Sequence, residues 1–585
     1  LPIWRSMIDE DSFSDSDKDN LKNGMGLKKP VLIGIVIAIA AVVVVVAVVV
    51  VLVVSSNDKK DKEPDPTPTN PTQTPTAPFE IKNFDKGGKI SFNDIRMYQV
   101  YTSAFRHGEG GADGFQKSGG CYGPSDCTAN LKGITEALDY IKDLGMNAIW
   151  LTPFLESNIK ESKNYAKTRL ESTGYYATNF FKVDSRLGTN DDFKDLVKKA
   201  HEKGIYVFMD AVLGHCGNTV SPSPKGATAS VNSKAEITAE SGNIRYPESL
   251  DFFYEFFDFW INGFEVDGFR FDQADQLYNG KRDNYWRYIR VHVENIYQKR
   301  RNEGKEWGTL GYITSEIWKS DEEIVKVMNN YGLFGALDFQ SRYRLVKSTA
   351  CQEYSKEYGY SPKTTDSFKE MENFFINKDI YTNNNNLKIK DTSITRTFYL
   401  NAFITSHDLK RYGNLMNQNC DKADKGQYCA EYDSEDYWRR HKLALALLAA
   451  YGGPITIYYG DEYGAYTPPY SGSDHIAADN EARTNGRIDG FTVNEQNLVD
   501  YTRKLLKLRV NYNLSQPITN YFGTGSYGFA VKGDVIIGFN TDNKDKTIKQ
   551  TELSGYSSVI DLITNEPFDL SGEFTLKQGR CYYFK

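Results

Sequence analysis

The chain has 585 residues and a formal net charge of −7, with acidic and basic residues interspersed along it. This length allows a large hydrophobic core together with accessory parts. Since lysines cluster only beside one apolar segment, the charge pattern excludes nucleic acid as an expected partner. The seven cysteines are not spaced as the ligands of a zinc site.

The chain begins with a polar, acidic stretch, residues 1–30, followed by 24 residues, 31–54, without a charge or a strongly polar group. At a rise of about 1.5 Å per residue, such a helix spans the roughly 30 Å hydrocarbon core of a bilayer. The run is longer than the apolar part of a cleaved signal peptide. We therefore expect 31–54 to be a transmembrane signal anchor and 1–30 to be a cytosolic tail.

Residues 55–90 predict a stalk, because PDPTPTNPTQTPTAP at 64–78 is extended and cannot pack. Lysines flank both ends of the apolar run, so the positive-inside rule barely sets its orientation. The stalk and the sequon Asn513-Leu514-Ser515 favour a type II protein whose main body is extracellular or lumenal.

Two close cysteine pairs support the same side of the membrane: Cys121/Cys127 and Cys420/Cys429. Each pair lies in a loop-like stretch and could close a short disulfide in an oxidising compartment. Reduced, unrelated thiols are the alternative. The other three cysteines, Cys216, Cys351 and Cys581, have no assigned partner.

From residue 91 to 509, short apolar runs alternate with amphipathic stretches such as Asp191–Lys203. This alternation predicts an α/β fold, a (β/α)8 TIM barrel with long loops, and a small inserted domain B at about 216–250. A doubly wound sheet is the alternative, but no Gly-rich phosphate loop opens the first unit. Residues 510–585 predict a C-terminal antiparallel β-sandwich. The expected barrel strands are Met97–Tyr101, Ala148–Thr152, Tyr206–Val212, Gly268–Asp272, Tyr312–Glu316, Ala336–Phe339, Phe403–Ser406 and Ile455–Tyr459.

Polar side chains follow four of these strands. The C-terminal ends of barrel strands form the face on which barrel enzymes build their active sites. One such carboxylate alone is more often a cap or a loop residue, but four in succession favour a catalytic site. The four segments are DAVLGH at 210–215, GFRFD at 268–272, TSEIW at 314–318 and ITSHD at 404–408.

These segments resemble the α-amylase superfamily, glycoside hydrolase family 13, and further matches extend the resemblance from about residue 96 to the C-terminus. The further matches are LDYIKDLGMNAIWLTP at 138–153, GYYATNFFKVDSRLGTNDDFKDLVKKAHEKGIYVFMD at 174–210 and GGPITIYYGDE at 452–462. The resemblance implies hydrolysis, with retention, of α-1,4-glucosidic bonds in starch, glycogen or maltodextrins.

The resemblance also implies a role for each site residue. Asp272 is the expected nucleophile and Glu316 the expected acid/base, while Asp408 binds sugar hydroxyls. Arg270 lies two residues before Asp272 on a strand, points to the same face and can keep Asp272 ionised. The remaining expected substrate-binding residues are His407, His215, Asp210 and the stacking residue Tyr175.

Three residues depart from the family pattern. Gly214 stands where the family usually has an Asn calcium ligand, which puts the usual Ca²⁺ site in doubt. Asp275 and Gln276 replace a Lys-His pair common in true α-amylases, so a maltodextrin hydrolase or a transglycosylating enzyme stays open. The acidic loop His107–Gly114 offers Glu109 and Asp113 to a hard cation, although a solvated loop is favoured.

A different class of protein shares this organisation. The heavy subunits of amino-acid transporters also combine one membrane anchor with an amylase-like ectodomain, and they commonly lose catalytic residues. This chain keeps all the site residues and has no cysteine between residues 55 and 120. The sequence therefore favours the enzyme over the transporter partner.

Overall fold

The computed structural model describes residues 79–113, 127–157, 173–217, 219–232, 241–274, 285–350, 367–376, 386–418, 430–467, 482–549, 553 and 558–585. Contacts divide the chain into residues 1–76 and residues 77–585, and every described residue belongs to the second unit.

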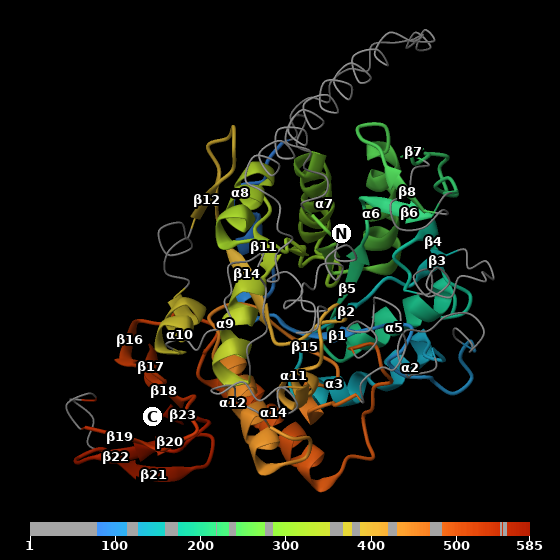
Figure 1. Ribbon diagram of the computed structural model, residues 1–585. Coiled ribbons are helices and arrows are strands. Elements are labelled where there is room, and N and C mark those ends of the chain that lie inside the picture. The colour runs from blue at the N-terminus through green and yellow to red at the C-terminus, as the bar shows by residue number, and fades with distance from the viewer. Residues whose placement is uncertain are drawn as a thin grey trace, which may run out of the picture. The chain divides into compact units, whose positions relative to one another are not determined.

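Eight parallel strands close into a barrel in the order β1-β15-β14-β11-β10-β9-β5-β2 (Figure 1). The closed barrel confirms the predicted (β/α)8 fold. The strands are β1 (Arg96–Val100), β2 (Ala148–Leu151), β5 (Tyr206–Ala211), β9 (Gly268–Phe271), β10 (Tyr312–Ser315), β11 (Gly335–Leu337), β14 (Tyr399–Phe403) and β15 (Ile455–Tyr458).

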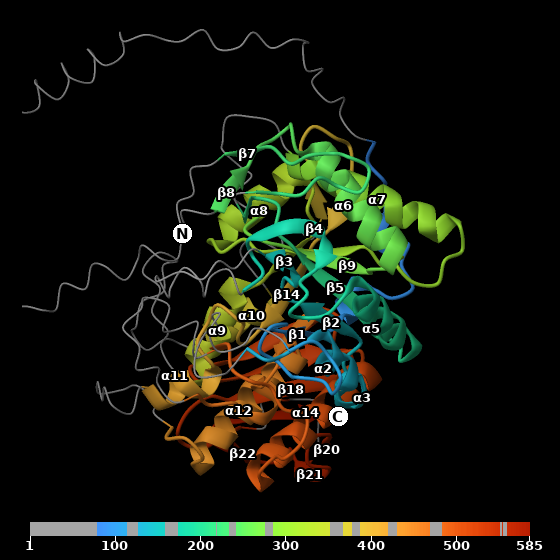
Figure 2. The same ribbon diagram turned by 90° about the vertical axis from the view of Figure 1, so that its right-hand side faces the viewer.

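Helices lie outside these strands and pack on one another, for example α2 on α5 and α6 on α7 (Figures 1 and 2). The sequence of helix α5 explains both its start and its packing. Thr189 and Asp192 form a capping box at its N-terminus. One face of the helix is apolar and buried, with Phe193, Leu196, Val197 and Ala200. The helices are α2 (Leu131–Glu136), α3 (Leu138–Leu144), α5 (Asn190–Glu202), α6 (Leu250–Phe264), α7 (Tyr285–Asn302), α8 (Asp321–Tyr331), α9 (Phe339–Thr349), α10 (Ser367–Ile376), α11 (Tyr412–Gln418), α12 (Glu435–Ala449) and α14 (Val493–Asn511).

Six strands differ from the predicted ranges by one residue at one or both ends, and β14 and β11 differ by more. The strand β14 spans Tyr399–Phe403, whereas the sequence predicts Phe403–Ser406. It includes the buried Asn401, whose Oδ1 atom accepts a hydrogen bond from Thr456 Oγ1 at 2.9 Å. The strand β11 ends at Leu337, since Asp338 caps α9 by accepting the amide of Ser341 at 2.9 Å. The polar residue Asn401 within β14 and the helix cap Asp338 after β11 are the two features that the apolar pattern did not reveal.

Short sheets lie in the loops that follow β2 and β5. The first pairs β3 (Leu155–Ser157) with β4 (Ala177–Val183). The second has the order β6-β8-β7, with β6 at His215–Gly217, β7 at Val231–Asn232 and β8 at Ser241–Ile244. This second sheet occupies the range expected for domain B.

The C-terminal part is an antiparallel β-strand domain, as predicted. A six-stranded sheet has the order β16-β17-β18-β23-β20-β21, and β19 pairs separately with β22. Residues of both sheets, including Phe529, Ile536, Ile548 and Leu576, share one hydrophobic core. The strands are β16 (Asn520–Thr524), β17 (Tyr527–Lys532), β18 (Val535–Asn540), β19 (Lys546–Ile548), β20 (Ser558–Asp561), β21 (Glu566–Asp569), β22 (Phe574–Leu576) and β23 (Arg580–Phe584).

The predicted membrane protein requires correction. In the described part of the chain, no helix is long and apolar enough to cross a membrane. The strongly apolar α6 has only 15 residues, whereas a span needs about 20. The apolar run 31–54, the tail 1–30 and the Pro/Thr stretch 64–78 lie outside the described residues. We therefore withdraw the predicted anchor, the membrane partner and the type II localisation.

The predicted disulfide pairs remain untested. Cys127 is buried and disulfide-bonded, but Cys121, Cys420 and Cys429 lie outside the described residues. Cys216 and Cys581 are buried free thiols.

A buried ionic network ties the segment before β1 to the barrel. Glu80 contacts Arg287 and Arg290 of α7, each at 2.6 Å. Glu294, one turn further along α7, contacts Arg290 at 2.8 Å and accepts hydrogen bonds from both terminal nitrogens of Arg396. Burial opposes ionisation of Glu294, but the two guanidinium groups outweigh it and lower its pKa. The network holds its charges only because each one has a partner.

We expect Glu294→Gln to destabilise the fold by about 3–5 kcal/mol at pH 7, because Arg290 and Arg396 lose a buried anionic partner. Urea unfolding measures this change. Glu306→Gln is the control, since Glu306 pairs with Lys89 at the surface, and it should change stability by less than about 1 kcal/mol. Equal effects of the two substitutions would contradict the prediction.

Candidate active site

The strand β9 positions the centre of the site. Phe269 and Phe271 point outwards, where Phe269 packs on Phe257 of α6 and Phe271 stacks on Trp286 of α7. Strand alternation therefore turns Arg270 into the barrel, where 1% of it is exposed. Asp210 is its neighbour in the register of β5.

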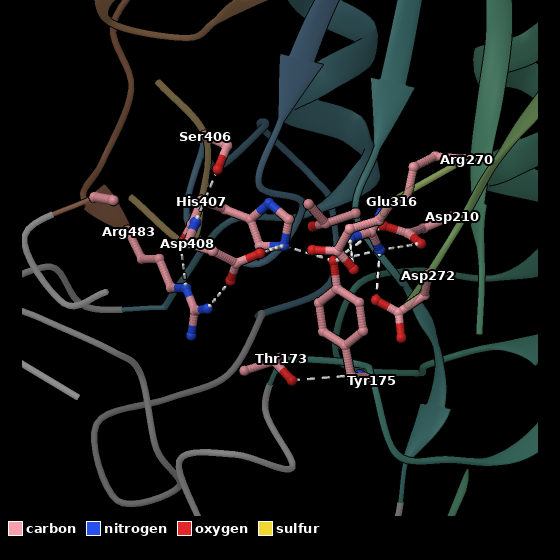
Figure 3. A network of polar contacts seen from close by, with 12 residues as sticks. Thr173, Tyr175, Asp210, Arg270, Asp272, Glu316, Ser406, His407, Asp408 and Arg483 are labelled. Carbon is pink, nitrogen blue, oxygen red and sulfur yellow. Dashed lines mark hydrogen bonds and ion pairs between the residues drawn. The ribbon is translucent and has the colours of Figure 1, made fainter. Parts of the chain in front are cut away.

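Arg270 contacts three carboxylates (Figure 3). Its Nη1 atom lies 2.7 Å from both Asp210 Oδ1 and Asp272 Oδ1. Its Nη2 atom lies 2.8 Å from Glu316 Oε2. Burial opposes the charge of Arg270, yet these acids outweigh it and raise its pKa. One cation therefore organises the ends of β5, β9 and β10.

The carboxyl groups around Arg270 differ in how readily they ionise. The pKa of Glu316 is raised to about 8: burial is the largest cause, Asp272 and Asp408 act in the same direction, and Arg270 and the amide of Gln273 oppose the shift. Burial also raises the pKa of Asp210 to about 7, again against Arg270. Glu316 is therefore a proton donor near neutral pH.

Tyr175 bridges the two halves of the site. Its hydroxyl donates to Asp210 Oδ2 at 3.0 Å and lies 2.6 Å from His407 Nε2. The turn before it requires glycine: Gly174 has a φ of +80°, and a Cβ there would lie 2.3 Å from the carbonyl oxygen of Pro153. Tyr175 thus comes to the site from the β3–β4 hairpin.

His407 is held neutral in one tautomer. Burial lowers its pKa to about 3, despite the nearby Asp408. The side-chain amide of Gln99 on β1 donates to Nδ1 at 2.8 Å, so the ring proton lies on Nε2. The proton on Nε2 faces the Tyr175 hydroxyl and Asp408 Oδ2, and the Nε2 atom lies 3.1 Å from that carboxylate oxygen.

Asp408 is fixed by a residue from another loop. Arg483 donates from Nη2 to Asp408 Oδ1 at 2.7 Å and from Nε to the carbonyl oxygen of His407 at 2.9 Å (Figure 3). Burial opposes ionisation, but His407, Arg483 and Arg270 together lower the pKa of Asp408. Asp408 is therefore an anion, five residues beyond the end of β14.

The structure brings all the candidate site residues together. Each of them lies within hydrogen-bond distance of another, except His215. His215, at the start of β6, has its Nδ1 atom 3.9 Å from Asp272 Oδ2. The sequence patterns assign no role to three residues that hold the site together, Gln99, Gln273 and Arg483. A glutamine inside the apolar strand segment MYQVY was the only signal for Gln99; the other two lie in loops without a distinctive pattern.

The suggested calcium site stays a prediction. Gly214 has no side chain to offer, and Glu109 and Asp113 are exposed. Among the described residues, no group of three or more His, Cys, Asp and Glu side chains could hold a metal ion. Asp275 and Gln276 lie outside the described residues.

A family model, described as the α-amylase catalytic domain, matches residues 99–237 and 240–503. Among curated proteins, the chain is 24% identical over 400 residues to a cyclomaltodextrinase of Thermoanaerobacter pseudethanolicus, covering 64% of this chain and 58% of that protein. It is 25% identical over 413 residues to a β/α-amylase of Paenibacillus polymyxa, covering 66% of this chain and 27% of that protein. The chain thus spans less than two thirds of the length of these relatives.

Solved structures are also similar to this chain. AmyP in complex with maltose is 30% identical with a TM-score of 0.69, covering 84% of this chain and 96% of that one. An AmyP variant in complex with maltotriose is 31% identical, also with a TM-score of 0.69, covering 84% and 97%. An α-amylase from Geobacillus thermoleovorans, complexed with acarbose, shares the fold at 20% identity and a TM-score of 0.60, covering 85% and 99%.

We expect Arg270→Met to destabilise the fold by about 3–5 kcal/mol at pH 8 and by less at pH 5. Losing the cation raises the pKa values of Asp210 and Glu316 further. A carboxyl group whose pKa is raised by folding costs stability only above its unfolded value of about 4, and the cost grows as the pH rises towards the folded value. Urea unfolding at both pH values measures the difference.

The matched control is Arg503→Met, because Arg503 pairs with Asp143 and Asp500 at the surface. It should cost less than about 1 kcal/mol at either pH. A loss in Arg270→Met that is the same at pH 5 and pH 8 would show that Arg270 does not neutralise these acids.

Proposed function

Since the chain belongs to the α-amylase family of glycoside hydrolases, we propose that it hydrolyses α-1,4-glucosidic bonds of starch, glycogen or maltodextrins with retention of configuration. The observation that carries this proposal is the single guanidinium of Arg270 shared by Asp210, Asp272 and Glu316. The maltose and maltotriose complexes of AmyP support a linear glucan as the substrate class.

Asp272 is the proposed nucleophile. Its Oδ1 atom is held by Arg270, which leaves Oδ2 to attack the anomeric carbon and form a glycosyl-enzyme. Because Arg270 contacts both Asp272 and Glu316, the two carboxyl groups are held close together. Retaining enzymes keep them about 5–5.5 Å apart, while inverting enzymes leave room for a water molecule between them.

Glu316 is the proposed acid/base. With its pKa raised to about 8, it enters the reaction protonated and gives its proton to the leaving glycosidic oxygen. The resulting carboxylate then takes a proton from the water that hydrolyses the glycosyl-enzyme. Asp408, His407, His215 and Tyr175 are proposed to bind and orient the sugar ring.

The family contains several activities, and the relatives include both a cyclomaltodextrinase and amylases. The choice between endo-amylase, cyclomaltodextrinase and transferase lies in subsites beyond the cleaved bond. The product ladder from maltoheptaose, compared with that from β-cyclodextrin, tests this choice. The transporter heavy-chain alternative receives no support from the comparisons.

We expect the full chain to release reducing sugar from soluble starch or maltooligosaccharides, and Asp272→Asn to abolish the release. Glu316→Gln should lower kcat by about 10²–10⁴-fold, the usual contribution of general acid–base catalysis. The same variant should act nearly normally on α-glucosyl fluoride in the first step, because fluoride departs with little protonation. No release by the wild type from any of these glucans, or normal turnover by Asp272→Asn, would refute the hydrolase.

The pH profile gives an independent test. We expect kcat/KM for maltooligosaccharides to fall above about pH 8, where Glu316 loses its proton. The decline should be absent with α-glucosyl fluoride, which needs no proton donor. Initial rates between pH 5 and pH 10 measure both profiles. A decline with the same midpoint for both substrates would assign it to another group.

A further inference from the structure

The residue that follows Asp272 has an unusual backbone conformation. Gln273 has a φ of +39°, in the left-handed region that residues other than glycine rarely adopt. This conformation directs two successive amides at Glu316. The amide of Gln273 donates to Glu316 Oε2 at 2.9 Å, and that of Ala274 donates to the Glu316 carbonyl oxygen at 2.8 Å.

The surrounding structure holds this turn in place. Trp286 of α7 donates from Nε1 to the carbonyl oxygen of Ala274, and its ring stacks on Phe271 at 4.7 Å. The amide of Asp272 is held by the carbonyl oxygen of Ala211 at 3.1 Å, and that of Glu316 by Phe271 at 2.8 Å. The turn is therefore fixed on both sides, as a strained functional conformation requires.

The contacts to Glu316 are asymmetric. Within the described residues, every hydrogen bond and ion pair to its carboxyl group ends on Oε2: the Gln273 amide at 2.9 Å and Arg270 Nη2 at 2.8 Å. An oxygen that accepts two N–H bonds, one of them from a cation, is the less favourable place for a proton. The proton of the neutral acid consequently belongs on Oε1.

The geometry points to Gln273 as a positioning residue: its left-handed backbone places an N–H on Glu316 Oε2 and thereby reserves Oε1 as the oxygen that carries and transfers the proton. This inference rests on the proposed acid/base role of Glu316. In the first step Asp272 Oδ2 bonds to the anomeric carbon, the bond from that carbon to the glycosidic oxygen breaks, and this oxygen takes the proton from Oε1. In the second step water bonds to the same carbon, the bond to Asp272 breaks, and Oε1 takes a proton from the water.

The charged groups that act on Glu316 come from two barrel strands and the loops after them. Arg270 is on β9, Asp272 follows it and Asp408 lies after β14. Arg270 favours the ionised acid, while Asp272 and Asp408 oppose it. The Gln273 amide is the neutral donor in this set, so its removal changes no net charge. Losing it raises the pKa of Glu316, because a hydrogen bond to the carboxylate stabilises the charged form.

The test compares residues that accept the left-handed region with one that does not. Gln273→Gly and Gln273→Asn keep φ positive and keep the amide. Gln273→Val disfavours positive φ, since β-branched residues rarely adopt it. We expect Gln273→Val to lower kcat for maltooligosaccharides about 10–100-fold, part of the general-acid contribution, and to move the decline at high pH upwards. Gln273→Gly and Gln273→Asn should keep the wild-type profile.

A second measurement separates this inference from the proposed function. The protonated carboxyl band of Glu316, taken from infrared spectra by subtracting Glu316→Gln, should titrate at higher pH in Gln273→Val than in Gln273→Gly. This readout needs no turnover. If the wild type hydrolyses no glucan but the band shifts, the proposed function fails and the positioning contact stands. If turnover is normal and neither the band nor the pH profile shifts, the positioning role is overturned.

A backbone ester covers the case in which Gln273→Val does not fold. Replacing Gln273 by its α-hydroxy acid removes only the N–H and keeps the side chain. The ester should show the same upward shift of the Glu316 titration and the same loss of kcat, with activity on α-glucosyl fluoride retained. An unshifted titration in the folded ester protein would overturn the inference.

Discussion

The buried guanidinium of Arg270 is the interaction on which the site depends. Asp210, Asp272 and Glu316 lie at the ends of three neighbouring strands, so the barrel brings their negative charges together whether or not this is favourable. Without a cation among them, they could not all remain buried in a usable protonation state. The cation does not neutralise them equally, and burial still keeps Glu316 protonated to about pH 8.

The second half of the site uses neutral hydrogen bonds in series. Gln99 fixes the tautomer of His407, His407 meets Tyr175, and Tyr175 donates to Asp210. Each group in this series has a donor and an acceptor role that follows from its neighbour. Tyr175 thereby links the loop after β14 to the C-terminal end of β5. The proposed sugar-binding residues are thus held by the same contacts as the residues proposed to do the chemistry.

The sequence predicted the barrel and most of the site because both follow from local pattern. In β9, alternation alone turns Arg270 inwards, and Asp272 follows at the strand end. The sequence missed Gln99, Gln273 and Arg483, whose roles depend on contacts between distant segments or on one backbone angle. It placed the strand before His407 and Asp408 too late, because the buried Asn401 interrupts the apolar pattern. The membrane assignment was wrong for another reason: it rested on the hydropathy of residues 31–54, which lie outside the residues that the structure describes.

The contact between Glu80 and α7 has a practical consequence for handling the protein. Glu80 and Phe84 are buried, although they precede the first barrel strand. A protease that trims the chain only as far as residue 79 leaves the ionic network whole. A cut beyond Glu80 removes the carboxylate that Arg287 and Arg290 share, while Arg290 keeps Glu294. The trimmed product keeps every residue of the site, but loss of the buried Glu80 carboxylate should lower its melting temperature. Loss of activity on storage would then come from the broken ionic network at α7, not from damage to the carboxylates of the active site.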